Sequence, residues 1–290
     1  MRRYWVDGTF ILPAFVVFTV FLVIPVLSSF YYSLTDWNGL NPDTHFIGFS
    51  NYTKLLTDTD VWNAIKNTLT IAICLTVVKN ALGLTLALGL QGTGRIHRIL
   101  RVWYLIPVML SALAIGYIWA YMYSPSDGVI NTLLRMLDLD GIAQDWLGNS
   151  SLAIYSIIFV SVWHFVGFTM IIYVAGLQSV PADVYEAAFL DGAGRWSMFK
   201  NVTFPLIAPS FTVNIIVNMI VGIKIFDTIF VMTNGGPGTS TENLSILLYR
   251  QAFSFDRMGY ASAIAVVMFV TILIFSIVQI TVLRKREVDY

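Results

Sequence analysis

The sequence predicts an all-α membrane protein with six transmembrane helices. Of its 290 residues, 57% are hydrophobic and only 12% are charged, and the mean hydropathy is +0.73. A soluble domain typically carries about 25% charged residues, so the composition is not that of a water-soluble globule. Six apolar runs are also long enough to cross a bilayer, which takes roughly 20 helical residues.

The apolar runs define the expected helices in chain order. They are Phe10–Tyr32, Thr68–Leu90, Ile99–Tyr121, Leu152–Leu177, Leu206–Thr228 and Ala261–Leu283. Arg2 and Arg3 precede the first run, as they would in a secretory signal peptide, but the run is too long for a signal core and no small-residue cleavage site closes it. It is predicted to remain as an anchor. We expect two parts, an N-terminal helix with an outer loop over residues 1–66 and a five-helix core over residues 67–290.

Lys and Arg are divided unevenly between the segments that connect these helices. If the N-terminus is cytoplasmic, the inner segments hold Arg2, Arg3, Arg95, Arg98, Arg101, Arg195, Lys200, Arg284, Lys285 and Arg286. The outer segments then hold only Lys54, Lys66, Arg135, Arg250 and Arg257. Because cytoplasmic flanks retain basic residues, both termini are predicted to be cytoplasmic. The net charge is zero, so no overall field attracts nucleic acid, and no nucleic-acid partner is expected.

A polar segment, residues 181–209, separates the fourth and fifth runs and is cytoplasmic on this topology. Acidic residues begin a stretch of helix formers over residues 183–190, where they suit the positive end of the helix dipole. Gly192 and Gly194 then provide an end. We expect a short helix, a turn and a returning helix that begins near Thr203.

The spacing in this segment resembles the EAA motif of permease subunits of binding-protein-dependent ATP-binding-cassette importers. In that family, Glu-Ala-Ala is followed after three residues by Gly and after nine more by Ile-x-Leu-Pro. The matching residues here are Glu186, Ala187, Ala188, Gly192, Val202, Phe204 and Pro205. Val202 and Phe204 replace the Ile and Leu, which keeps the spacing and the apolar character.

Further stretches resemble the carbohydrate-type permeases, such as the maltose and glycerol-phosphate systems. These stretches are Asp191–Gly194 with Trp196 and Phe199, Met232–Pro237 followed by Tyr249 and Ala252-Phe253, and Gly259–Ala263. Together the matches cover nearly the whole chain from the second helix onward.

The resemblance implies a fold, a location and a set of partners. The fold is that of a type I importer permease in the cytoplasmic membrane of a bacterium or archaeon, where the chain forms half of a channel with a second, homologous permease. A cytoplasmic ATPase dimer would bind ATP and Mg, an extracytoplasmic binding protein would deliver the solute, and this chain would need no cofactor. The contact with the ATPase would lie in a coupling loop, residues 178–205, and involve Glu186, Ala187, Ala188, Asp191, Gly192 and Pro205.

The residue types in the coupling loop suit that contact. Small alanines let a partner surface approach the helix backbone, and Glu186 offers a carboxylate to a cation on the partner. Gly192 lets the chain turn without a side-chain clash. Pro205 and Pro209 suit the first turns of the returning helix, where a missing N–H costs little. A solvated loop without a partner is the alternative.

The sequence contains no pattern for catalysis or metal binding. It lacks Gly-x-x-x-x-Gly-Lys-Ser/Thr, and the glycine-rich residues 234–239 include no lysine. His45, His97 and His164 fall in different segments, without the spacing of metal ligands or a Ser/His/Asp set. The chain is therefore expected not to be an enzyme and to hold no metal.

Polar residues at membrane depth are costly, so their positions indicate a solute pathway. One face of the fourth predicted helix carries Ser161, His164, Phe165 and Phe168, and one face of the fifth carries Asn214, Asn218, Gly222 and Ile225. By resemblance, all of these except Asn214 match the stretches that contact sugar in the maltose permease subunit. For each residue, an interhelical packing or hydrogen-bonding contact is the alternative.

Three charged residues lie within or beside the spans. Lys79, near the middle of the second helix, is interpreted as structural. Lys224 and Asp227 lie three residues apart near the outer end of the fifth helix, a spacing that allows them to pair, and they too are interpreted as structural. Of the three, Lys224 is the one expected to meet an anionic solute.

We therefore expect a permease subunit that imports a carbohydrate, an oligosaccharide or other glycoside, by ATP-driven alternating access. A phosphorylated polyol such as glycerol phosphate is the nearest alternative, for which only Lys79 and Lys224 offer positive charge. An ion-coupled secondary transporter would need coupling-ion sites and internal repeats. A membrane-bound enzyme would need a catalytic constellation, and the sequence shows none of these features.

Overall fold

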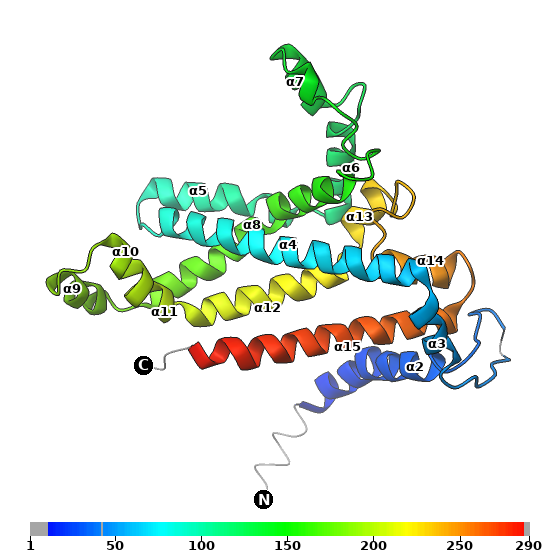
Figure 1. Ribbon diagram of the computed structural model, residues 1–290. Helices are drawn as coiled ribbons and strands as arrows, with labels where there is room; N and C mark the ends of the chain where they lie inside the picture. The colour runs from blue at the N-terminus through cyan, green and yellow to red at the C-terminus, as the bar shows by residue number, and fades with distance from the viewer. Residues whose placement is uncertain (1–10, 42, 287–290) are drawn as a thin grey trace, which may run out of the picture. The chain divides into compact units, whose positions relative to one another are not determined.

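The computed structural model describes residues 11–41 and 43–286. Outside this range lie Arg2, Arg3, Phe10 and both chain termini. The regular structure of the described residues is helical (Figure 1), apart from one antiparallel bridge between Thr35 and Phe46. The predicted all-α class is confirmed.

Five helices in the described part of the chain are long and apolar enough to span a membrane. They are Ile11–Tyr32, α4 (Thr59–Leu90), α8 (Ala153–Ser179), the α12–α13 segment (Ala208–Met232) and α15 (Met258–Leu283). The first contains a π-helical turn, Thr19–Val23, before α2, Ile24–Tyr32. α4 begins at Thr59 rather than at the predicted Thr68, because Asp58 Oδ1 accepts a hydrogen bond from the backbone N–H of Asp60 in its first turn.

Shorter helices connect or flank these spans. They are α3 (Ser50–Thr57), α7 (Val129–Met136), η3 (Asp140–Ile142), α9 (Ala182–Leu190), α10 (Arg195–Met198), η4 (Phe199–Thr203), α11 (Phe204–Leu206), α14 (Leu244–Phe253) and η5 (Arg284–Arg286).

The third predicted span is not one continuous helix. It consists of α5 (Arg95–Leu105), a 3-10 turn at Pro107–Met109 and α6 (Ala112–Met122), and the two parts are bent by 95°. Pro107 has no N–H to continue the hydrogen-bond ladder, and Leu110 and Ser111 adopt extended backbone angles. The transmembrane helix predicted over residues 99–121 is therefore broken in the middle, and the described spans number five, or up to six if the bent pair counts as one.

Arg101 ties the start of this bent pair to the end of α4. Its Nε donates a hydrogen bond of 2.8 Å to the carbonyl of Leu90, and its Nη2 donates one of 2.7 Å to the carbonyl of Gly92. A cation at the C-terminal end of a helix satisfies free carbonyls and complements the dipole. The basic residue predicted from the sequence to mark the cytoplasmic flank thus also caps a helix.

The fifth span is interrupted near one end. α12 (Ala208–Lys224) stops where Ile225 becomes extended, and α13 (Asp227–Met232) follows after Phe226. Asn243 Nδ2 donates a 2.6 Å hydrogen bond to the carbonyl of Ile225, which the break leaves without a helical partner. The Lys224–Asp227 pair that their spacing allows is not formed: the break places the two residues on different helices, both exposed, with no ion pair between them among the described residues.

The chain forms two compact units. One comprises residues 1–62 and 247–270, and the other comprises residues 63–246 and 271–290. In the described part of the first unit, Asn51 is buried and donates hydrogen bonds to two backbone carbonyls, and the hydroxyl of Tyr260 donates one of 2.7 Å to Asp58. The proposed division at residue 66 stays a prediction.

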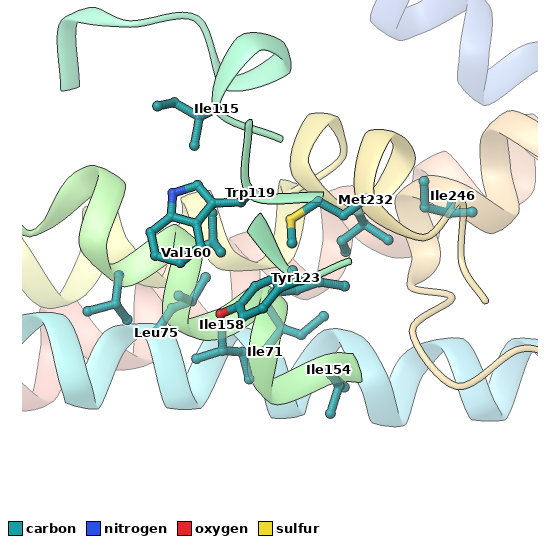
Figure 2. Packing of buried hydrophobic residues seen from close by; sticks show 13 residues of the cluster. Ile71, Leu75, Ile115, Trp119, Tyr123, Ile154, Ile158, Val160, Met232 and Ile246 are labelled. Atoms are coloured by element: carbon teal, nitrogen blue, oxygen red, sulfur yellow. The ribbon is translucent and has the colours of Figure 1, made fainter. Parts of the chain in front are cut away.

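The second unit contains the larger apolar core (Figure 2), which gathers side chains from five helices. Its labelled members are Ile71 and Leu75 of α4, Ile115 and Trp119 of α6, Tyr123, Ile154, Ile158 and Val160 of α8, Met232 of α13 and Ile246 of α14. Trp119 lies edge-on to two further rings of α8, with centroids 5.5 Å and 5.4 Å away. Trp119 is therefore a packing residue of this core.

Glycines let α4, α8 and α12 approach one another closely. A Cβ at Gly83 of α4 would lie 2.7 Å from the Thr169 side chain of α8, and one at Gly222 of α12 would lie 2.6 Å from Ala72 Cα of α4. Small residues at such crossings are typical of membrane helix pairs, which associate through close packing rather than through a hydrophobic driving force. Gly222 is therefore a packing residue.

This contact predicts that Gly222→Ala will lower the thermal stability of the purified protein in detergent. The added methyl group meets backbone, which cannot rotate away, so a cost of about 1–3 kcal/mol is expected. Gly89→Ala is the matched control, because a Cβ there meets no atom within 4 Å and alanine favours helix by up to about 1 kcal/mol. Equal midpoints for the two variants would contradict the close α4–α12 contact.

Candidate functional site

The coupling loop begins directly at the end of α8. α8 ends at Ser179, and two extended residues, Val180 and Pro181, separate it from the first residue of α9, Ala182. Asp183 lies in the first turn of α9, as expected. Because the connection is so short, a displacement of α9 reaches α8 through very few rotatable bonds.

The end of α9 depends on the glycine singled out from the sequence. Gly192 has a φ of +79°, a value that L side chains rarely adopt. This conformation lets the N–H of Gly192 bond to the Phe189 carbonyl and that of Ala193 bond to the Ala188 carbonyl, both at 3.0 Å. The predicted turn is present, and the reason for glycine is backbone conformation.

The return to the membrane starts earlier than predicted. Helical structure resumes at Arg195 rather than near Thr203, and it continues through α10, η4 and α11. Four rings pack along this stretch with neighbouring centroids 5.8, 6.0 and 5.3 Å apart: Trp196, Phe199, Phe204 and Phe211. The packing of these rings stabilises the helical turns before Thr203. The polar residues between the rings gave no sign of a helix there. Pro205 and Pro209 occupy first-turn positions of α11 and α12, as predicted.

The tip of α9 presents a mixed apolar and acidic surface. Phe189 and Leu190 are 74% and 84% exposed, and Glu186 is exposed beside them. Together with Tyr185 they line a hollow of about 360 Å³. Large exposed apolar side chains around a carboxylate are typical of a surface that binds another protein. Tyr185, Phe189 and Leu190 were missed in the sequence because their apolar type alone did not separate them from residues that pack inward.

The other predicted coupling residues lie around this tip. Ala187 is exposed and Ala188 is half-buried on α9, and Asp191 is exposed at the C-terminal end of the helix. Pro205 lies farther along the chain and is half-buried. The loop also reaches the end of α4, because Tyr185 and Arg195 share a hollow of about 760 Å³ with Leu88, Gly89 and Gln91.

The residues predicted to line a solute pathway on α8 differ in exposure. Ser161 and His164 are 2% and 1% exposed, Phe165 is half-buried and Phe168 is 44% exposed. His164 Nε2 lies 3.3 Å from the Leu110 carbonyl at the bend of the α5–α6 pair, and its ring lies beside Phe165 in a tilted arrangement with centroids 4.0 Å apart. Ser161 Oγ and His164 Nδ1 are buried without a hydrogen-bond partner among the described residues.

The predicted α12 residues make contacts between helices. Asn218 Nδ2 donates a 3.1 Å hydrogen bond to Thr169 Oγ1, and Asn214 Nδ2 donates one of 3.2 Å to the Thr169 carbonyl. Gly222 packs on α4, and Ile225 lies at the helix break. These are the interhelical contacts given as the alternative from the sequence, and a role in solute passage stays a prediction.

Three further polar residues between these helices were not singled out from the sequence. They are Asn80 of α4, and Thr169 and Tyr173 of α8. The Tyr173 hydroxyl donates a 2.6 Å hydrogen bond to Asn80 Oδ1. The available signal was the spacing of four between Thr169 and Tyr173, which places both on one helix face. We name this set with Asn214 and Asn218 the polar seam.

Residues 11–41 and 43–286 contain no candidate metal site. No group of three or more His, Cys, Asp and Glu side chains is positioned to hold an ion there. The arrangement offers an exposed apolar and acidic surface at α9 and a polar interior between α4, α8 and α12.

Comparison with known proteins finds consistent similarities. Residues 79–287 match the family model described as binding-protein-dependent transport system inner membrane component. The chain is 34% identical to a probable starch degradation products transport system permease protein, AmyD, of Thermoanaerobacterium thermosulfurigenes, over 99% of this chain and 95% of that protein. It is 33% identical to the multiple sugar-binding transport system permease protein MsmF of Streptococcus mutans, over 99% and 98% of the two chains.

A solved structure shares the fold. A chain of a bacterial alginate ABC transporter, crystallised in complex with an alginate pentasaccharide-bound periplasmic protein, superposes with a TM-score of 0.85. The match covers 98% of this chain and 96% of that one at 24% sequence identity. The predicted permease fold is confirmed at the level of its helices.

The backbone of Gly192 predicts that Gly192→Ala will loosen the coupling loop. An L residue at φ +79° costs about 1 kcal/mol, so tryptic cleavage after the exposed Arg195 should accelerate about fivefold if it requires local opening. Gly194→Ala is the control, because Gly194 has a φ of −71° and open space around it. The same acceleration in both variants would show that the left-handed turn is not what orders the loop.

The polar seam predicts coupling between Thr169→Val and Asn218→Leu. Each single change leaves a partner unsatisfied, so the double variant should be more stable than the sum of the single costs implies, by about 1 kcal/mol. The free energy of reversible unfolding in mixed detergent micelles is measured for the wild type, the two single variants and the double variant, which form a double-mutant cycle. Additivity to within about 0.3 kcal/mol would contradict a direct Thr169–Asn218 bond.

Proposed function

Because the chain belongs to the family of binding-protein-dependent transport system inner membrane components, we propose that it is the permease subunit of an ATP-driven sugar importer. The match to that family covers residues 79–287. Proteins of this family are permeases and not enzymes, and a separate subunit hydrolyses ATP. Family membership also removes the ion-coupled carrier and the membrane-bound enzyme considered from the sequence.

α9 is proposed to couple ATP hydrolysis to the membrane helices. The observation that carries this proposal is the exposed surface of Glu186, Phe189 and Leu190 on a helix joined to α8 through Pro181. In this proposal α9 docks on a cytoplasmic ATPase dimer, which binds ATP and Mg. A push on α9 would move α8 as a rigid body and shift the bundle between inward-facing and outward-facing states.

The proposed orientation places both termini and α9 in the cytoplasm. Its support is that two basic segments lie at one end of the second unit, where the end of α4 and the start of α5 meet α9 and α10 (Figure 1). Arg95, Arg98 and Arg101 belong to one segment, and Arg195 and Lys200 to the other. Both meet the expectation for a cytoplasmic flank.

We infer that the solute is a carbohydrate. AmyD and MsmF, which share about a third of their residues with this chain, are named for starch degradation products and multiple sugars. The proposed pathway runs along α8 and α12 and uses Ser161, His164, Phe165, Phe168, Asn218, Gly222 and Ile225. A second permease would complete it, and an extracytoplasmic binding protein, as in the alginate transporter structure, would deliver the solute.

Glu186→Ala tests the coupling proposal. The variant removes the carboxylate offered to the ATPase, and if the interaction resembles a charge-assisted hydrogen bond, association should weaken about tenfold or more. Co-purification with the ATPase and ATP-dependent solute uptake in vesicles measure the effect. Asp183→Ala, an exposed carboxylate on the same helix, should change both much less. Undiminished association and uptake in Glu186→Ala would reject the proposal.

A further inference from the structure

Lys79 is a buried charge that the proposed coupling and pathway leave unused. Its side chain is 2% exposed on α4, roughly 17 Å from the end of that helix at 1.5 Å per residue. A bilayer core is about 30 Å thick, so this position is deep within it. Among the described residues, the other buried charged side chain is Glu242, which lies in the loop between α13 and α14.

The ammonium group of Lys79 faces an aromatic ring instead of a carboxylate. Its Nζ lies 5.4 Å from the centre of the Phe165 ring of α8, and α8 contains no acidic residue. Lys79 forms no ion pair within the described residues. A cation–π contact contributes about 2 kcal/mol when desolvated, whereas burial of an unpaired charge costs several kcal/mol. The site thus has a positive charge whose counter-ion is supplied from elsewhere.

Two more polar atoms on the same side of α8 are unpartnered. Ser161 Oγ and His164 Nδ1 are each on a side chain at least 98% buried, and neither has a hydrogen-bond partner in the described part of the chain. Ser161 lies four residues before Phe165, on the same helix face, and the His164 ring lies 4.0 Å from that ring, centroid to centroid. The ammonium group and the imidazole thus both lie beside Phe165, and the hydroxyl shares its helix face.

We propose that Lys79, together with Ser161 and His164, binds an anionic group of the transported solute, so that this permease imports an acidic glycoside. The charged oxygens of a carboxylate, sulfonate or phosphate accept strong hydrogen bonds from an ammonium group. A hydroxyl of the sugar can pair with the serine and the imidazole. The inference rests on the proposed sugar pathway and adds the charge of the solute. These side chains are buried in this conformation, and the proposal places solute contact in the state that follows a rearrangement of the helices.

The charge that completes the site comes from the solute in this proposal, and the acidic side chain of a second permease is the other source. The unpartnered Ser161 hydroxyl and His164 nitrogen favour the solute, because an acidic sugar offers hydroxyl groups for them as well as a charge for Lys79. Exchange of Lys79 for an uncharged residue separates the two sources. If the solute supplies the counter-charge, the loss of uptake is larger for an acidic solute than for its neutral counterpart. If the second permease supplies it, the loss is the same for both.

The test uses the complete transporter in proteoliposomes with probes matched in pairs. The acidic probes are digalacturonate, sulfoquinovosyl glycerol and glycerol 3-phosphate, and their neutral counterparts are galactobiose, glucosyl glycerol and glycerol. Wild type is expected to take up at least one acidic probe ten times faster than its counterpart. Lys79→Met should reduce that uptake tenfold or more, and Lys79→Arg should retain it. Lys66→Met, an exposed lysine on the same helix, should leave it unchanged.

Each other outcome overturns a defined statement. Uptake of neutral probes alone, or an equal loss for both members of a pair in Lys79→Met, overturns the acidic-solute inference and leaves the sugar importer intact. Failure of Lys79→Met to co-purify with the second permease, while Lys79→Arg does so, assigns the counter-charge to that subunit and also overturns it. Uptake of none of the sugar probes by wild type rejects the proposed function itself.

Discussion

Thr169 joins the three helices on which the proposed transport function depends. Its hydroxyl bonds to Asn218 and its carbonyl accepts from Asn214, both of α12, while its side chain lies against Gly83 of α4. In a hydrocarbon environment these groups find no water to replace their partners, so the bonds hold the helices in one register. α9 follows α8 after two residues, and any force on the coupling loop therefore reaches a fixed group of helices.

The far end of the same group is fastened by amide side chains. Asn63 and Asn67 of α4 donate hydrogen bonds to the backbone of the loop after α13, through the carbonyls of Thr239 and Glu242. Asn243, at the end of that loop, bonds to the carbonyl at the α12–α13 break. α4 is thus bonded to α8 in its middle and to this loop at its end, while Arg101 caps its other end. Such a helix transmits displacement along its length with little bending.

The interior of this group sets a chemical constraint on what it can carry. Most of its polar atoms pair with one another, as in the polar seam, and those contribute to structure. Ser161 and His164 leave hydrogen-bonding capacity unused within the described residues, as does Asn214 Oδ1 of the polar seam. Lys79 differs from all of these because its charge is unpaired there. A polar group buried without a partner is costly. An unpartnered polar group at membrane depth therefore indicates a ligand more strongly than a polar residue that is already hydrogen-bonded within the protein.

The sequence by itself determined the all-α class, the positions of five spans and the helix and glycine turn of the coupling loop, because hydropathy, capping and a left-handed turn are local properties. Local rules did not predict the 95° bend at Pro107, because a membrane helix can accommodate a proline without breaking. They also did not predict that helical structure resumes at Arg195, because this depends on aromatic rings that pack across successive turns. Only the tertiary structure decided which polar residues pair, separated Lys224 from Asp227 and enclosed Lys79. Those outcomes depend on the rotation and distance of helices far apart in the chain, and these follow from the fit of glycines and side chains across each crossing.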